Sequence, residues 1–406
     1  MQAHRQTSPP TGDLRPEAGR ATHVTERPMS KLPDVGTTIF TVMSQLAAEC
    51  GALNLAQGFP DFAVPQALAD GVVEALRAGH NQYAPMAGLP ALRAAIARKT
   101  EALYGRRTDP LAEVTVTSGA TEGLFCAIQA CVGPGDEAIV FDPAYDSYEP
   151  AIRLAGGRTV HVPLRPPQFD IDWDRVRAAL TARTRLIVLN SPHNPTGAVL
   201  RPADLVALAE LVRDRPIVLL GDEVYEHIVF DGLRHESLLR HPELAARSLV
   251  VSSFGKTCHA TGWKVGYVVA PPGLTTEFRK VHQFVQFCVV TPVQHALAAF
   301  IDADPGHHLG LGAFYQAKRD LLCSLLAGSR FRLTPARGTY FQLLDYRDIS
   351  DEDDVALAER LTRTAGIATI PVSVFNAVPD GTRLLRLCFA KDDRTLRAAA
   401  ELLCAI

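Results

Sequence analysis

The chain has 406 residues, of which 47% are hydrophobic and 21% are charged, as expected of a globular protein with a sizeable core. It contains 41 Lys and Arg against 44 Asp and Glu. This balance, with no basic tract or aromatic stripe, argues against functions that depend on binding a polyanion such as nucleic acid. No apolar run approaches the roughly 18 residues that a membrane-spanning helix needs.

The cysteines and the N-terminal segment bear on the cellular compartment. The eight cysteines show neither a C-x-x-C pair nor a Cys/His metal spacing, and no signal peptide precedes them, so we expect reduced thiols in a cytoplasmic enzyme without a metal. Residues 1 to about 30 are rich in Arg, Pro, Thr and Gly and lack a periodic apolar face. We expect residues 1–30 to form a disordered tail, and Met29 to be the natural start.

Downstream of the tail, a short helix over 39–48 and an extended piece over 53–55 precede an alternation of helices and β-rich runs. The expected helices are 67–78, 89–104, 122–132, 174–180 and 202–213. The expected strands are 114–117, 138–141, 159–162, 186–190, 217–220, 248–252 and 265–270. This alternation predicts an α/β fold with a mainly parallel sheet and helices on both faces.

After residue 291 the pattern changes. Longer helical stretches cover 292–303 and 308–327, and short strands are expected at 331–333, 340–344, 368–370 and 384–389. These elements indicate a separate α+β unit.

Loops that follow strands carry the candidate chemistry, because functional groups gather beyond the carboxyl ends of parallel strands. Small residues at 118–123 open a helix and would let backbone N–H groups approach an anion such as phosphate. Asn194 lies in a turn pinned by two prolines, and Asp222 follows a strand directly. Each feature alone is more often a helix cap or a structural loop than a binding site.

Lys256 lies in the fourth of these loops, with Lys264 eight residues later. Only 7 of the 41 basic residues are Lys, so the remaining 34 are Arg. In a chain biased to Arg, a retained Lys is a candidate for chemistry in which an amine loses its proton and attacks a carbonyl. A surface lysine retained by chance is the alternative.

Together the loops resemble the class-I pyridoxal-phosphate aminotransferases, and within them the methionine aminotransferases related to kynurenine and glutamine transaminases. The resemblance rests on ordered motifs from residue 31 to the C-terminus. They are QGFPDF (57–62), NQYAPMAG (81–88), SGATEG (118–123), DPAYDSYEP (142–150), NSPHNPTG (190–197), GDEVYEHI (221–228), SSFGKTCHATGWKVGY (252–267) and RLCFAK (386–391). The resemblance implies the fold type I architecture, with a large cofactor domain over 66–291 and a small domain built from 31–65 and 292–406. It also implies a homodimer with shared active sites.

The resemblance further implies roles for individual residues around pyridoxal 5'-phosphate. Lys256 would bond to the cofactor aldehyde and then act as the base, Asp222 would pair with the pyridine nitrogen, and Tyr225 would hydrogen-bond the ring oxygen. Asn194 would share that oxygen and Tyr145 would stack on the ring. The phosphate would be held by Gly119, Ala120, Thr121, Ser253, Lys264 and, from the partner subunit, Tyr83.

For the substrate, the resemblance implies that Arg386 binds the α-carboxylate as a bidentate pair, with the backbone of Gly58 beside it. Phe40, and Phe287 from the second subunit, would line the side-chain pocket. These apolar groups favour methionine and aromatic amino acids as donors to a 2-oxo acid. The alternatives are a cysteine-S-conjugate β-lyase and a kynurenine-oxoglutarate transaminase, although Cys288 stands where kynurenine-type relatives can carry His.

Two other classes of function are disfavoured. A transcription regulator that senses the cofactor would need a helix-turn-helix module, for which the Pro-rich N-terminal segment is too short. A nicotinamide dehydrogenase is disfavoured because no G-x-G-x-x-G follows the first strands.

Overall fold

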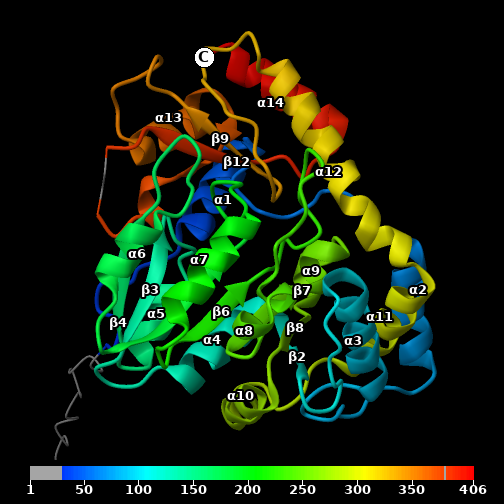
Figure 1. Ribbon diagram of the computed structural model, residues 1–406. Helices are drawn as coiled ribbons and strands as arrows, with labels where there is room; N and C mark the ends of the chain where they lie inside the picture. Colours follow the sequence, from blue (N-terminus) through cyan, green and yellow to red (C-terminus); the bar gives the residue numbers. More distant parts are fainter. Residues whose placement is uncertain (1–29, 379–380) are drawn as a thin grey trace, which may run out of the picture.

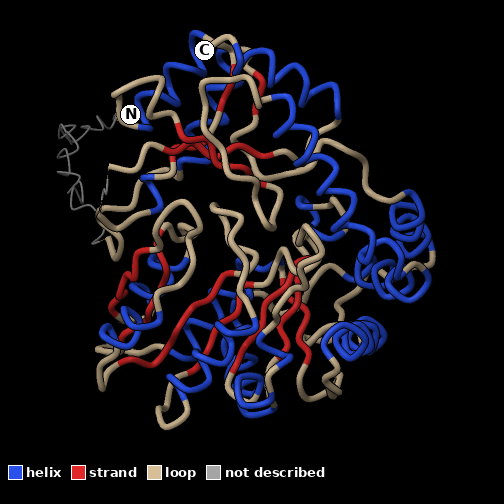
Figure 2. Tube along the Cα trace, turned by 45° about the horizontal axis from the view of Figure 1, so that its top comes forward, coloured by secondary structure: helices blue, strands red, loops and turns tan. Residues whose placement is uncertain are grey.

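The computed structural model describes residues 30–378 and 381–406. The predicted disordered tail therefore lies, apart from its last residue, outside the described residues. In this part of the chain a seven-stranded sheet and two smaller sheets are present, and Figure 2 shows the strands in an upper and a lower group. No helix among the described residues is both long enough and apolar enough to cross a bilayer.

The seven-stranded sheet has the order β2-β8-β7-β6-β5-β3-β4. Its strands are β2 (Val114–Thr117), β3 (Glu137–Asp142), β4 (Arg158–Pro163), β5 (Thr184–Asn190), β6 (Val218–Asp222), β7 (Ser248–Ser253) and β8 (Gly266–Val269). All neighbouring pairs are parallel except those of β8, which runs antiparallel to both β2 and β7. The mainly parallel sheet expected from the sequence is thus observed, with one reversed strand that returns directly from β7 without a crossover.

Helices cover both faces of this sheet and enclose separate apolar clusters on its two sides. The helices between residues 66 and 303 are α2 (Gln66–Arg77), α3 (Pro90–Tyr104), α4 (Gly119–Cys131), α5 (Tyr148–Leu154), α6 (Trp173–Ala179), α7 (Pro202–Val212), α8 (Pro242–Ala245), α9 (Phe254–Thr257), α10 (Pro272–Val285) and α11 (Thr291–Ala303). Of these, α2 packs against α11 at the side of the sheet. The helix expected over 122–132 begins at Gly119, directly after the loop that follows β2. Its N-terminus therefore opens at the carboxyl end of that strand.

The smaller sheets join the two ends of the chain. β1 (Leu53–Asn54) pairs in parallel with β10 (Ile367–Ala368), and a three-stranded antiparallel sheet has the order β11-β12-β9. Its strands are β9 (Phe341–Asp345), β11 (Ile370–Pro371) and β12 (Leu384–Cys388). The strand expected over 331–333 is wrong, because only an isolated bridge between Arg332 and Asp345 forms there.

The helices around these strands are α1 (Ile39–Cys50), α12 (Pro305–Leu325), α13 (Asp354–Thr364) and α14 (Asp393–Cys404). Figure 1 shows α12 running from the side of α11 up to α14, so it connects the two groups of strands. Local signals define several ends: the Thr38 hydroxyl caps α1, Gly51 ends it at φ 61°, and Asp392 caps α14. A third apolar cluster fills this part of the molecule.

Candidate active site

A cavity of about 220 Å³ lies where the carboxyl ends of β5, β6 and β7 face the smaller sheets. Both chain ends contribute to it, since Phe40 and Gly58 line it from one side and Phe341 and Arg386 from another. The cavity brings together most of the residues selected from the sequence. These are Phe40, Gly58, Gly119, Ala120, Thr121, Tyr145, Asn194, Asp222, Tyr225, Ser253, Lys256, Lys264 and Arg386.

Asp222, the last residue of β6, is buried and has one carboxylate oxygen free. Its Oδ2 accepts a 2.6 Å hydrogen bond from the Tyr148 hydroxyl, whereas Oδ1 receives none from the described residues. Burial raises the pKa of Asp222 to about 6, against the opposing effect of the Tyr148 hydrogen bond. Above that pH the side chain is a carboxylate with an unused acceptor in the cavity wall.

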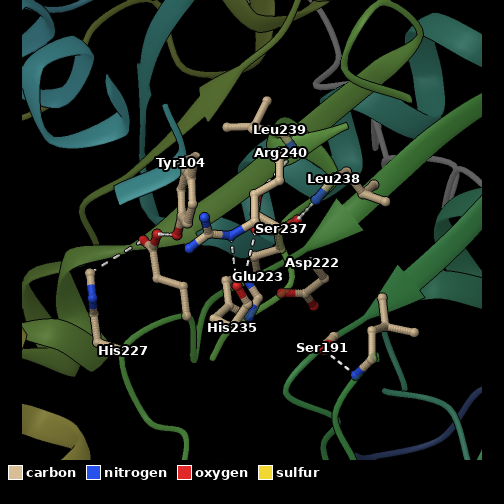
Figure 3. Close-up of polar contacts among 12 residues, drawn as sticks. Tyr104, Ser191, Asp222, Glu223, His227, His235, Ser237, Leu238, Leu239 and Arg240 are labelled. Atoms are coloured by element: carbon tan, nitrogen blue, oxygen red, sulfur yellow. Dashed lines mark hydrogen bonds and ion pairs between the residues drawn. The ribbon is translucent and has the colours of Figure 1, made fainter. Parts of the chain in front are cut away.

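The segment after Asp222 is anchored by buried hydrogen bonds. Figure 3 shows the carboxylate of Glu223 close to His235, and it accepts from His235 Nε2 at 2.8 Å and from the Leu238 backbone at 2.9 Å. Further along, the buried Glu226 carboxylate pairs with Lys99 Nζ at 2.7 Å. Glu223 and Glu226 therefore fix the loop that carries Asp222 and Tyr225.

Lys256 lies in α9, the short helix after β7. Its Nζ donates to the Tyr340 hydroxyl at 2.8 Å and to the Gly58 carbonyl at 3.1 Å. Burial lowers the pKa of Lys256 to about 8, so a larger fraction of the amine is neutral near neutral pH than for an exposed lysine. Tyr340 is not among the residues selected from the sequence, and it lies 84 positions away from Lys256 in the chain.

The N-terminus of α4 and Lys264 form one side of the cavity. Gly119 has φ 77°, and a Cβ built on it would lie 3.3 Å from Lys264 Nζ. Lys264 itself adopts a left-handed backbone at φ 54°. Backbone N–H groups at a helix start and a lysine amine form an anion-binding arrangement, so this is where a phosphate would fit.

Arg386 on β12 is 1% exposed and crosses the cavity. Its Nη1 donates to Asn194 Oδ1 and its Nη2 to the Ala56 carbonyl, each at 2.8 Å. Nε has no hydrogen-bond partner among the described residues, and none of their carboxylates forms an ion pair with the guanidinium. Burial lowers the pKa of Arg386 to about 10, so the side chain remains a cation at neutral pH.

Aromatic rings surround that guanidinium. Its Cζ lies 4.0 Å from the centroid of Phe341 and 5.1 Å from that of Phe40. Tyr225 is buried in the same wall, with its ring centroid 5.7 Å from Lys256 Nζ. The cavity thus combines cationic groups with an apolar, aromatic wall.

Tyr83 and Phe287 are not among the cavity residues of this chain. Both are exposed, at 81% and 56%, and their rings contact each other with centroids 5.2 Å apart. Their expected roles were assigned to a second subunit, and their place on the surface is compatible with that expectation.

Comparison with known proteins shows the family to which this chain belongs. The sequence profile of the aminotransferase class I and II family matches residues 51–403. The chain belongs to this family. The aminotransferase is 53% identical over 374 residues to a methionine aminotransferase of Escherichia coli, covering 92% of this chain and 97% of that protein. It is 33% identical over 405 residues to kynurenine–oxoglutarate transaminase 1 of Rattus norvegicus, covering 91% of this chain and 96% of the rat protein.

Solved structures agree with the sequence relatives. A crystal structure identified as an Escherichia coli methionine aminotransferase superposes with a TM-score of 0.92 at 52% identity, covering 94% of this chain and all of that one. N-succinyldiaminopimelate aminotransferase of Mycobacterium tuberculosis gives a TM-score of 0.90 at 38% identity, covering 93% of this chain and all of that one. The aminotransferase fold and activity expected from the sequence are confirmed.

Proposed function

We propose that this aminotransferase binds pyridoxal 5'-phosphate in the cavity and transfers the α-amino group of methionine or an aromatic amino acid to a 2-oxo acid. The observation that carries the proposal is Arg386, a buried cation with an unused Nε, in the same cavity as Lys256 and flanked by aromatic rings. An α-carboxylate would satisfy that cation. The Escherichia coli relative named as a methionine aminotransferase supports the choice of donor.

The residues present fit pyridoxal phosphate. The free Oδ1 of Asp222 is a buried acceptor that would receive a pyridinium N–H. Gly119, Ala120, Thr121, Ser253 and the amine of Lys264 would hold the phosphate, where a side chain at 119 would crowd Lys264. Tyr145 lines the cavity and would stack on the ring. When bound, the cofactor supplies an aldehyde that takes up the amino group and a ring that withdraws electrons from the substrate Cα.

The chain's own groups then divide the remaining work. Arg386 fixes the α-carboxylate with Nε and an Nη, in a charge-assisted bidentate contact. Lys256, whose lowered pKa of about 8 makes the neutral amine accessible, would remove the proton from the substrate Cα and return it to the carbon on the other side of the amino nitrogen. Asp222 is ionised above about pH 6 and would keep the pyridine nitrogen of the bound cofactor protonated. The amide N–H₂ of Asn194 is left to donate, because its Oδ1 accepts from Arg386.

Donor preference follows from the cavity wall. Phe40 and Phe341 lie beside Arg386, and the cations that line the cavity in the described part of the chain are Lys256, Lys264 and Arg386. Since those three have assigned tasks, the wall offers no cation for a second carboxylate. Thioether and aromatic side chains pack well on aromatic faces, so these donors are favoured over aspartate.

We also propose that the enzyme is a cytoplasmic homodimer. Exposed apolar side chains gather around the end of α10 and the segment after it, namely Tyr83, Phe284, Val285, Phe287 and Val290. Large exposed apolar patches of this kind mark protein interfaces. A partner seated here would bring Tyr83 and Phe287 to the neighbouring cavity. The eight cysteines are unbonded, which suits a reducing compartment.

A half-reaction tests the function. Enzyme loaded with pyridoxal phosphate is mixed with methionine alone, and the visible absorption of the aldehyde form is followed. Transamination predicts conversion to the amine form and its reversal when a 2-oxo acid is added. Retention of the visible band with methionine, together with pyruvate and ammonia from a cysteine conjugate, would favour a β-lyase and overturn the proposal.

A further inference from the structure

Tyr340 precedes β9 and is fully buried, yet its hydroxyl reaches the catalytic lysine. The hydroxyl donates to the Gly58 carbonyl at 2.6 Å, so its oxygen lone pairs are left for Lys256 Nζ, which donates to it at 2.8 Å. Nζ also donates to the Gly58 carbonyl at 3.1 Å. The amine, the phenol and the carbonyl thus form a closed triangle of hydrogen bonds.

We propose that Tyr340 is a positioning residue for Lys256, which holds one N–H of the amine while Gly58 holds another. A neutral amine has two N–H groups and one lone pair. With both N–H groups bound to acceptors on the same side, the lone pair is directed away from them, into the cavity where the substrate Cα must lie. The inference rests on the proposed role of Lys256 as the base.

The same short segment also orients the carboxylate-binding cation. Ala56 accepts from Arg386 Nη2, two positions before Gly58 accepts from Lys256. Gly58 can approach because it lacks a side chain, since a Cβ there would lie 2.7 Å from Cζ of Phe341. Residues 56–58 and Tyr340 therefore set the base and the carboxylate site relative to each other.

Other charged or titratable groups also act on the Lys256 amine. They are Cys388 and Arg386 of β12, Asp222 at the end of β6, Tyr225, and Lys264 before β8. Tyr340→Phe removes none of these groups, although it also removes the hydrogen bond between the hydroxyls of Tyr340 and Tyr225. An acceptor oxygen stabilises the ammonium more than the neutral amine, so loss of that oxygen must lower the pKa of Lys256 further.

The test compares Tyr340→Phe with Tyr315→Phe. Tyr315 is also fully buried, its ring centroid lies 5.7 Å from that of Tyr340, and its hydroxyl has no partner among the described residues. The Lys256 pKa is read by NMR of protein labelled at the lysine Cε, with cofactor bound in the amine form, in which Lys256 is free. The chain has only seven lysines, so a Lys256→Arg spectrum assigns the signal.

For Tyr340→Phe we expect kcat for methionine to fall about 10- to 100-fold with KM within twofold. The Lys256 pKa should fall by about half a unit or more, and the deuterium isotope effect at Cα should rise as proton transfer becomes slower. Tyr315→Phe should match the wild type in all four quantities. A 3,5-difluorotyrosine at 340, which keeps the ring but weakens the oxygen as an acceptor, should give a smaller change in the same direction.

An unchanged kcat, isotope effect and Lys256 pKa in Tyr340→Phe would overturn the inference, as would a change confined to KM or stability. If Tyr340→Phe does not fold, the difluorotyrosine protein decides by the same criteria. Lys256→Ala distinguishes this result from failure of the proposed function. If Lys256 is the base, Lys256→Ala is inactive although Tyr340 is unchanged. If Lys256→Ala is active, the proposed role of Lys256 itself fails.

Discussion

The carboxylate-binding role of Arg386 makes a quantitative prediction for Arg386→Lys. In the structure the guanidinium is fixed by Asn194 and Ala56, and Nε remains free beside an Nη, so two parallel N–H groups are available to a carboxylate. A lysine ammonium keeps the charge but provides a single contact point. The variant therefore loses one charge-assisted hydrogen bond, which contributes about 1.5 to 3 kcal/mol.

Because about 1.4 kcal/mol corresponds to a factor of ten, kcat/KM for methionine should fall roughly 10- to 150-fold. The assay measures kcat/KM with methionine and a fixed 2-oxo acid, and repeats it with methionine amide, which has no carboxylate to bind. Wild type and Arg386→Lys should differ little with the amide. A fall below threefold with methionine, or an equal fall with the amide, would refute the assigned role of Arg386.

Further predictions concern the cofactor site and the surface. Asp222 has a pKa raised from 3.8 to about 6 by burial, so its ionised form opposes folding; this cost is absent below pH 3.8 and complete above pH 6. In urea unfolding, Asp222→Asn should therefore raise the free energy of unfolding of the cofactor-free protein by about 1 to 3 kcal/mol at pH 8, and by much less at pH 4.5. The turnover of the same variant should fall by orders of magnitude. An equal gain at both pH values would contradict this reasoning. Gly119→Ala should weaken pyridoxal phosphate binding at least about tenfold, measured by fluorescence titration, because φ is 77° and the new Cβ would crowd Lys264. The control is Gly105→Ala, which is also at positive φ but whose Cβ would have nothing within 4 Å. This control variant should bind the cofactor normally. Phe284→Glu, at an 86% exposed position, should shift the mass in light scattering from twice 43.9 kDa to 43.9 kDa and reduce activity, and a stable, active dimer would contradict the proposed interface.

The fold could be predicted where the signal was local. Alternating buried strands and amphipathic helices predicted the large sheet, and the carboxyl ends of β6 and β7 predicted where Asp222 and Lys256 lie. The reversal of β8 was not predicted, because a run of apolar residues carries no direction. The expected strand at 331–333 failed since its apolar residues pack without pairing beyond one bridge.

The site could be predicted where a residue type has few other uses. A lysine in an Arg-rich chain is such a case, whereas the aspartate at the end of a strand gained its meaning only from the ordered motifs that resemble one family. Tyr340 was missed because it lies in a segment expected to be a buried strand, where a tyrosine is ordinary. Its contact with Lys256 depends on two sheets meeting across the cavity, and no local pattern reports such a distant pairing.

Replacement of Lys256 tests whether its amine is the base of the reaction. Lys256→Ala and the wild type are each loaded with pyridoxal phosphate and given methionine with a 2-oxo acid, while circular dichroism confirms that both are folded. We expect the wild type to turn over repeatedly and Lys256→Ala, with no base at this position, to show no turnover above background. Turnover of a folded Lys256→Ala enzyme near the wild-type rate would contradict this expectation.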